Sequence, residues 1–150
     1  HGMYKGWGIK YIGEWLNGTK TGRGIMYTTT SFEYKGIWYP PNSSFYEGDF
    51  INGEKTGWGK QQFPNGDYYE GSYINGERNG FGTYYFKNGE IYTGAFVKNN
   101  FEGYGILKYT DGYVFMGLFA NNKRNGDGAL INNKTGEQKS SKWKDDIEIK

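Results

Sequence analysis

The chain contains no cysteine among its 150 residues, and its single histidine is His1. Without thiols it has no disulfides and no thiolate chemistry, which suits a reducing compartment. Without an internal histidine, the catalytic triads that need one are excluded and a zinc site is implausible. His1 stands beside Gly2-Met3, which is typical of a cloning remnant. We therefore expect no metal, no cofactor and no catalytic site.

The chain also lacks long apolar runs and a strong charge of either sign. No stretch approaches the roughly 20 apolar residues that a membrane helix needs, and no secretory leader is expected. The formal net charge of +2 is too small to favour nucleic acid as a partner. These features predict a cytoplasmic protein. The Asn-x-Ser/Thr sequons at Asn17, Asn42 and Asn133 leave secretion as the alternative.

Glycine and aromatic residues are abundant instead, with 26 glycines and an aromatic content of 20%. A chain so rich in rings is expected to fold rather than to remain disordered. The pattern aromatic-x-Gly-x-aromatic recurs, mostly at a step of 23 residues, which indicates an internal repeat. Its starts are Tyr11, Tyr34, Tyr46, Tyr69, Tyr92 and Phe115.

One step, from Tyr34 to Tyr46, is only 12 residues long. Residues 34–39 run directly into residues 40–45, so a turn and a returning strand are missing from this segment. We interpret Tyr34 as the start of a truncated repeat. The predicted array covers residues 1–138, with a partial repeat at its N-terminus, and residues 139–150 form a degenerate C-terminal cap or tail.

The glycine columns have physical reasons. Gly71 lies between Tyr69 and Tyr73 on one strand face, because side chains alternate with period two. Its missing side chain is expected to leave room for an aromatic ring from the adjacent strand. Tight hairpin turns are predicted at the Asn-Gly and Asn-Asn pairs that follow. These are Asn17-Gly18, Asn52-Gly53, Asn75-Gly76, Asn99-Asn100 and Asn121-Asn122.

A Gly-x-Gly pair such as Gly57/Gly59 opens the returning strand, and a second turn such as Asn88-Gly89 leads into the next repeat. One repeat is therefore one hairpin plus a short link. Because a lone hairpin is marginal in water, the hairpins are expected to pair edge to edge. The predicted fold class is all-β, an elongated single-sheet antiparallel β-hairpin solenoid.

The frame Tyr-x-Gly-x-aromatic-x-Asn-Gly-x-x-x-Gly-x-Gly, as in residues 46–59 and 69–82, resembles the MORN repeat (membrane occupation and recognition nexus). The resemblance covers residues 11–136, with departures at Ser31 and Asn132. It implies a non-enzymatic scaffold that binds a partner protein segment, at a membrane–cytoskeleton site. The alternative it implies is an anionic phospholipid-binding module, or an accessory module of a larger enzyme such as a lipid kinase.

Two surfaces are candidates for binding. The first is the aromatic face, where a helical or extended segment of a partner protein is expected to lie. The alternative is that these rings only pack on one another. The predicted partner-binding residues are Tyr46, Phe50, Tyr69, Tyr73, Tyr92, Phe96, Phe115 and Phe119.

The second surface is the row of hairpin tips, because the tenth residue of four repeats is basic. An anionic membrane is the expected ligand of this edge, and solvated charge is the simpler interpretation. The residues are Lys20, Lys55, Arg78 and Arg124. Homo-oligomer formation, which would multiply such contacts, stays open.

Two further alternatives follow from the composition. A glycosidase needs two nearby carboxylates, but the acidic residues fall on alternating strand positions, which is typical of a solvated sheet surface. They are Glu14, Glu47, Asp49 and Glu70. An aromatic repeat can also bind carbohydrate or choline, the latter through cation–π contacts. The abundance of Tyr and Phe over Trp makes this alternative the weaker one.

Overall fold

The computed structural model describes residues 2–6, 8–28, 32–34, 37–39 and 44–150. It comprises two compact parts, the N-terminal part (His1–Gly76) and the C-terminal part (Glu77–Lys150), which we describe separately. Every regular element in the described ranges is a β-strand. Across these ranges, no helix has the length and apolar character needed to cross a membrane. The predicted fold class, an all-β antiparallel hairpin repeat, is confirmed.

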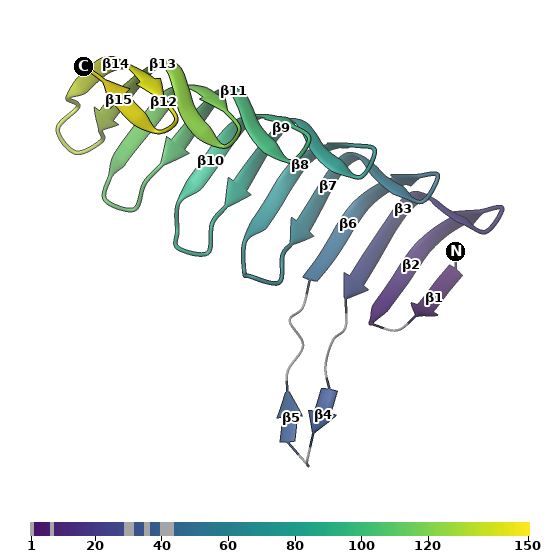
Figure 1. Ribbon diagram of the computed structural model, residues 1–150. Helices are drawn as coiled ribbons and strands as arrows, with labels where there is room; N and C mark the ends of the chain where they lie inside the picture. The colour runs from purple at the N-terminus through teal and green to yellow at the C-terminus, as the bar shows by residue number, and fades with distance from the viewer. Residues whose placement is uncertain (1, 7, 29–31, 35–36, 40–43) are drawn as a thin grey trace. The chain divides into compact units, whose positions relative to one another are not determined.

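The N-terminal part contains one antiparallel sheet whose strands follow one another in chain order (Figure 1). Its strands are β1 (Gly2–Gly6), β2 (Ile9–Leu16), β3 (Thr19–Thr28), β6 (Ser44–Ile51), β7 (Glu54–Gln62) and β8 (Tyr68–Ile74). In β8 the residues Tyr69, Gly71 and Tyr73 are buried and alternate with more exposed residues. The period of two expected from the sequence therefore sets which side chains face inward.

The C-terminal part is also a single antiparallel sheet in chain order (Figure 1). Its strands are β9 (Glu77–Tyr85), β10 (Ile91–Val97), β11 (Asn100–Lys108), β12 (Tyr113–Ala120), β13 (Lys123–Asn132), β14 (Gln138–Lys144) and β15 (Ile147–Ile149). The segment expected as a cap or tail forms the β14–β15 hairpin. Ser141 pairs there with Gly128, as Gly117 pairs with Gly105 one repeat earlier.

Two-residue turns close the hairpins, and both residues of each turn have positive φ. Asn52 (φ 51°) and Gly53 (φ 82°) show the pattern, which matches the twist of paired strands. The predicted turn Asn99-Asn100 is wrong by one residue, because Lys98 (φ 47°) and Asn99 (φ 71°) occupy the turn. The distance from the first ring of the repeat fixes the turn, and Asn100 already begins β11.

Each of these turns after Asn17-Gly18 is also bonded to the repeat before it. The N–H of the second turn residue donates to the carbonyl of the preceding repeat's tenth residue. The pairs are Gly53 to Lys20 (3.0 Å), Gly76 to Lys55 (2.9 Å), Asn99 to Arg78 (2.9 Å), Asn122 to Phe101 (3.1 Å) and Asp146 to Arg124 (3.0 Å). Because turn N–H groups otherwise point into solvent, this ladder aligns the hairpin tips.

The segment beginning at Tyr34 is not a truncated repeat of the main sheet, which corrects the expectation from the sequence. β3 pairs directly with β6, and Gly24 lies opposite Gly48 as Gly59 lies opposite Gly71. Between them, β4 (Phe32–Tyr34) and β5 (Ile37–Tyr39) pair only with each other as a separate two-stranded sheet. The 12 extra residues are thus an insertion in one link. In this sheet, the first strand of each repeat pairs with the returning strand of the repeat before it. A repeat without a returning strand therefore offers no strand with which the next repeat can pair.

Candidate functional site

In the N-terminal part, the two glycines that face each other within one hairpin are covered by the tyrosine of that hairpin, Tyr11 over Gly13 and Gly24 and Tyr46 over Gly48 and Gly59. A Cβ added at Gly48 would lie 2.5 Å from the Tyr46 Oη, and one added at Gly59 would lie 2.5 Å from Tyr46 Cε2. The expectation that the ring over Gly48 comes from the adjacent strand is therefore wrong. Strand side chains lean along the strand, so Tyr46 reaches over the residue two positions ahead.

The tyrosine hydroxyl fixes this position. It donates a hydrogen bond to the backbone carbonyl three residues later in the same strand. The pairs are Tyr11 with Glu14 (3.1 Å), Tyr46 with Asp49 (2.9 Å), Tyr69 with Ser72 (2.9 Å) and Tyr92 with Ala95 (2.7 Å). Ala95 lies at a register shift in the pairing of β10 with β11, where the ladder leaves its carbonyl available. The fifth repeat has Phe115 and no hydroxyl.

Edge-to-face contacts join the rings into a column in each part. Tyr46 meets Phe50 of its own repeat at 5.1 Å between centroids and Tyr73 of the next repeat at 5.1 Å. In the C-terminal part Tyr92 meets Phe96 at 5.2 Å and Phe119 at 5.1 Å. Each such pair contributes about 0.5–1.5 kcal/mol beyond area burial. The ring column therefore holds successive repeats together.

All eight rings predicted to bind a partner lie in this column and are 0–3% exposed. They are Tyr46, Phe50, Tyr69, Tyr73, Tyr92, Phe96, Phe115 and Phe119. In the C-terminal part Phe101 stacks on Tyr92 at 3.9 Å between centroids and covers it further. The rings thus form the interior of each part and leave no free surface for a partner. Of the two interpretations of the aromatic face, the structure shows mutual packing.

The four basic residues predicted as a lipid-binding edge are half-buried and lie against the rings. Lys55 Nζ lies 5.3 Å from the Tyr46 ring centroid, and Lys20 Nζ lies 5.6 Å from that of Tyr11. Arg78 Cζ lies 5.5 Å from the Tyr84 centroid. The tenth residue therefore covers the ring column as a cation, a role that Phe101 takes over in the remaining repeat.

Arg124 contacts both a ring and a carboxylate of the β14–β15 hairpin. Its guanidinium carbon lies 4.3 Å from the Trp143 ring centroid, within cation–π range. Its Nε lies 3.1 Å from Asp146 Oδ1, and Nη2 donates to the Asp146 carbonyl at 3.0 Å. The backbone N–H of Arg124 donates to the same carboxylate at 2.7 Å. This residue therefore fastens the β14–β15 hairpin to the sheet.

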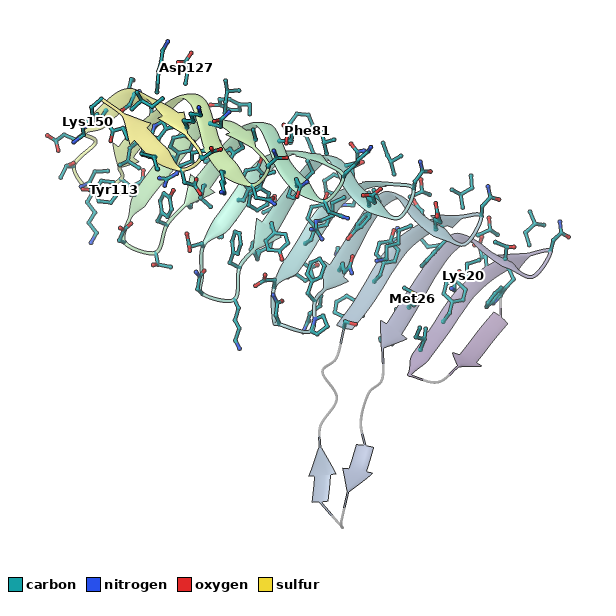
Figure 2. The ribbon with its side chains drawn as sticks, in the orientation of Figure 1. Lys20, Met26, Phe81, Tyr113, Asp127 and Lys150 are labelled. Carbon is teal, nitrogen blue, oxygen red and sulfur yellow. The ribbon has the colours of Figure 1, made fainter. Side chains whose placement is uncertain are left out.

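Three aromatic side chains that were not predicted as site residues lie on the outer faces of the two parts, where the outer face of each part is the one opposite its ring column. Trp58 is 52% exposed, Phe81 is 71% exposed and Tyr104 is 53% exposed. Each stands between the two glycines of a Gly-x-Gly pair, so the signal was present in the sequence. In Figure 2 the side chains of Phe81 and Asp127 project from the outer face of the C-terminal part. We call Trp58, Phe81 and Tyr104 the outer aromatic residues.

The outer face of the N-terminal part carries the acidic residues, as the alternation predicted. Lys60 lies opposite Glu47 on one side and opposite Glu70 on the other. Arg23 Nη1 lies 3.7 Å from Asp49 Oδ1. These carboxylates are interleaved with cations on a solvated surface. Within the described ranges, no group of three or more His, Cys, Asp or Glu is arranged to hold a metal ion.

Burial changes the ionisation of the column tyrosines. Desolvation raises the pKa of Tyr46 above its ordinary value, and the nearby Asp49 charge raises it further. Desolvation also raises the pKa of Tyr92, with a further contribution from Glu102. These hydroxyls are therefore neutral donors at physiological pH. They serve the structure and supply no acid or base for catalysis there.

In each part, aromatic rings pack over glycines and hydrogen bonds join successive hairpin turns. These features define a class, the β-hairpin repeat proteins that lack a conventional central core. Comparison with family models gives the member of this class. The MORN repeat model matches residues 11–30, 46–68, 69–91 and 92–112, which is more than half of the chain, and the chain belongs to this family. No curated protein matches the sequence. The matched ranges pass over Tyr34, in agreement with the insertion.

Proposed function

We propose that this chain is a non-enzymatic interaction module that binds a partner protein on the outer face of its sheets. The exposure of the three outer aromatic residues carries the proposal, because large exposed rings mark partner sites. The rings of the inner column already pack on one another and are buried. MORN repeats occur in protein and membrane-associated interaction modules and are generally non-enzymatic, which supports the assignment. We place the module in the cytoplasm, at a membrane or cytoskeletal surface.

Affinity capture from the native cell tests the proposal. The baits are the whole chain, the triple variant Trp58→Ser/Phe81→Ser/Tyr104→Ser, and a control variant Tyr113→Ser. Tyr113 is the control because its ring is 38% exposed but lies on the same side of β12 as the buried Phe115, not on the outer face. We expect proteins captured by the whole chain and by the control to be lost with the triple variant. An unchanged set of captured proteins with the triple variant would contradict the proposal.

A second candidate function is binding to anionic phospholipid, which the row of cations at the tenth repeat position favours. Each cation near such a surface contributes about 1 kcal/mol. Their contacts with the rings make them half-buried and reduce this attraction. Binding of choline in the ring column is disfavoured, because Lys55 already holds the position over the Tyr46 ring that a quaternary ammonium would take.

Co-sedimentation with vesicles separates the two candidates. Phosphatidylcholine vesicles with and without phosphatidylserine are mixed with the whole chain and with the variant that has Ser at Lys20, Lys55, Arg78 and Arg124. A matched variant loses the same charge through Ser at Lys60, Lys108, Lys142 and Lys144. Phosphatidylserine-dependent binding that only the first variant loses would support the lipid function. Equal loss with both variants would indicate net charge alone.

A further inference from the structure

The outer face of the C-terminal part differs from that of the N-terminal part in its charge pattern. In the N-terminal part, acidic and basic side chains lie opposite one another, as at Glu47 and Lys60. In the C-terminal part the corresponding row is uncharged. It runs through paired residues of β9 to β14, namely Thr83, Thr93, Ile106, Met116, Ala129 and Ser140.

A second row on the same face is apolar and well exposed. Phe81 lies opposite Ala95, and Tyr104 lies opposite Leu118, which is 41% exposed. Three of these four side chains, Phe81, Tyr104 and Leu118, are large and exposed. A shallow depression lies beside it, and its lining includes Tyr104, Met116, Asp127, Ala129, Ser140 and Lys142. This surface can accept apolar side chains of a partner.

Three exposed lysines border these rows. Lys108 lies opposite Ile91 and Val114, and Lys142 lies opposite Asp127. Lys144 is two residues after Lys142 and shares its face, because strand side chains alternate. None of the three forms an ion pair with any residue that the structure describes. With Asp127 as the one opposing carboxylate among these outer residues, the face is apolar at its centre and positive at its border.

We propose that this face binds an acidic amphipathic segment of a partner protein. Apolar residues of the segment pack on Phe81, Tyr104 and the depression, and its carboxylates meet Lys108, Lys142 and Lys144. Charge complementarity of this kind selects an acidic partner over a basic one. The uncharged row from Thr83 to Ser140 crosses six strands and so spans about 24 Å, which is the length of a helix of about 16 residues. The inference rests on the proposed function and names the chemistry of the partner.

Fluorescence anisotropy with the whole chain tests this. The probe is a labelled synthetic helix of about 16 residues with Leu at helical spacing and Glu elsewhere, and the comparison peptide has Lys in place of Glu. We expect the acidic peptide to bind at least about tenfold more tightly than the basic one. Phe81→Ser/Tyr104→Ser should weaken its binding about tenfold or more. Lys108→Glu/Lys142→Glu should reverse the preference.

The matched control is Trp58→Ser, which removes from the N-terminal part a ring about as exposed as Tyr104 and should leave peptide binding unchanged. All variants change exposed residues, so circular dichroism and melting temperature should match the whole chain. Equal binding of both peptides, binding of neither, or loss of binding with Trp58→Ser would overturn the inference. So would a dimer, detected by light scattering, that Phe81→Ser dissociates, because a second copy would then occupy the face. A partner captured through Trp58 alone would leave the proposed function standing while this inference fails.

Discussion

Tyr92 illustrates how one hydroxyl contributes to this fold. Its ring covers Gly94 and Gly105, and its hydroxyl donates to the Ala95 carbonyl at 2.7 Å. In Tyr92→Phe the ring contacts remain and the carbonyl loses its donor. We expect the free energy of unfolding to fall by about 1 kcal/mol in urea denaturation. Tyr113→Phe, at a 38% exposed tyrosine, is the control and should change it by less than about 0.5 kcal/mol. Equal losses would show that this hydrogen bond is not stabilising.

The reverse substitution is available in the fifth repeat. Phe115 is 0% exposed and occupies the place that a tyrosine takes in the other repeats, and Leu118 lies at the same register shift as Ala95. Phe115→Tyr should therefore donate to the Leu118 carbonyl and raise the free energy of unfolding by about 0.5–1.5 kcal/mol. Thermal and urea denaturation measure the change. A lower melting temperature would show that the fifth repeat has no room for the hydroxyl.

Gly105 tests the role of the glycine columns. A Cβ at this position would lie 2.5 Å from Tyr92 Oη and 2.6 Å from Tyr92 Cζ. The ring is fixed by its hydrogen bond and its neighbours, so Gly105→Ala should cost about 1–3 kcal/mol through overpacking. Gly136→Ala is the control for conformational strain, since Gly136 has a φ of 77° and nothing within 4 Å. If Gly105→Ala lowered the free energy of unfolding by less than Gly136→Ala does, this would contradict the interpretation that the glycine columns leave room for the tyrosine rings.

At the scale of elements, the insertion between β3 and β6 can be removed. Deletion of residues 32–43 makes the spacing from Gly24 to Gly48 equal to that from Gly59 to Gly71. Because β3 already pairs with β6 in the standard register, we expect the shortened chain to keep its β circular dichroism and its cooperative unfolding. Its melting temperature should stay within about 4 °C of the parent, since a shorter loop costs little entropy.

Deletion of residues 46–57 is the matched control. It removes the same number of residues but takes away most of β6 and the start of β7, and leaves the 34–39 segment to pair with β3. We expect this variant to lose cooperative unfolding. If both deletions behave alike, the segment beginning at Tyr34 would be able to act as a repeat strand, contrary to its position in the structure.

Local patterns predicted the strands and most turns, because each depends on residues a few positions apart. The Asn-Gly turns at Asn17, Asn52 and Asn75 were predicted correctly, since positive φ at both turn residues is a property of the dipeptide. The turn at Lys98-Asn99 was not, because the repeat register sets it there. The pairing of β3 with β6 depends on which of two similar strands has a returning strand, a choice made across the sheet.

At the scale of the molecule, the sequence identified which residues face inward but not what covers them. Alternation correctly placed Tyr73 on the inner face of the N-terminal part and Phe96 on the inner face of the C-terminal part. Whether a single sheet leaves that face open depends on sheet twist and on the tenth residue of each repeat, which lies over the rings. The aromatic face that was predicted to bind a partner is therefore the interior of each part. The outer aromatic residues were not predicted, because each Gly-x-Gly pair was interpreted only as the start of a returning strand and the residue between its glycines was not considered.

The tyrosines of both parts predict sensitivity to alkali. Burial raises the pKa of Tyr11, Tyr46, Tyr92 and Tyr109 in the folded chain above the value of about 10 in the unfolded chain. Their contribution to stability is complete below about pH 10 and declines as the pH rises toward the folded-state values. Each tyrosine that stays protonated while its unfolded counterpart ionises lowers the free energy of unfolding by about 1.4 kcal/mol per pH unit. Urea denaturation between about pH 8 and 12 should show a plateau and then a steep fall, and Tyr46→Phe/Tyr92→Phe should make the fall shallower. Two outcomes would show that these hydroxyls are not protected by burial. One is an unchanged slope of the free energy of unfolding against pH in the double variant. The other is tyrosinate absorbance that appears near pH 10, about the ordinary tyrosine pKa, while the chain stays folded.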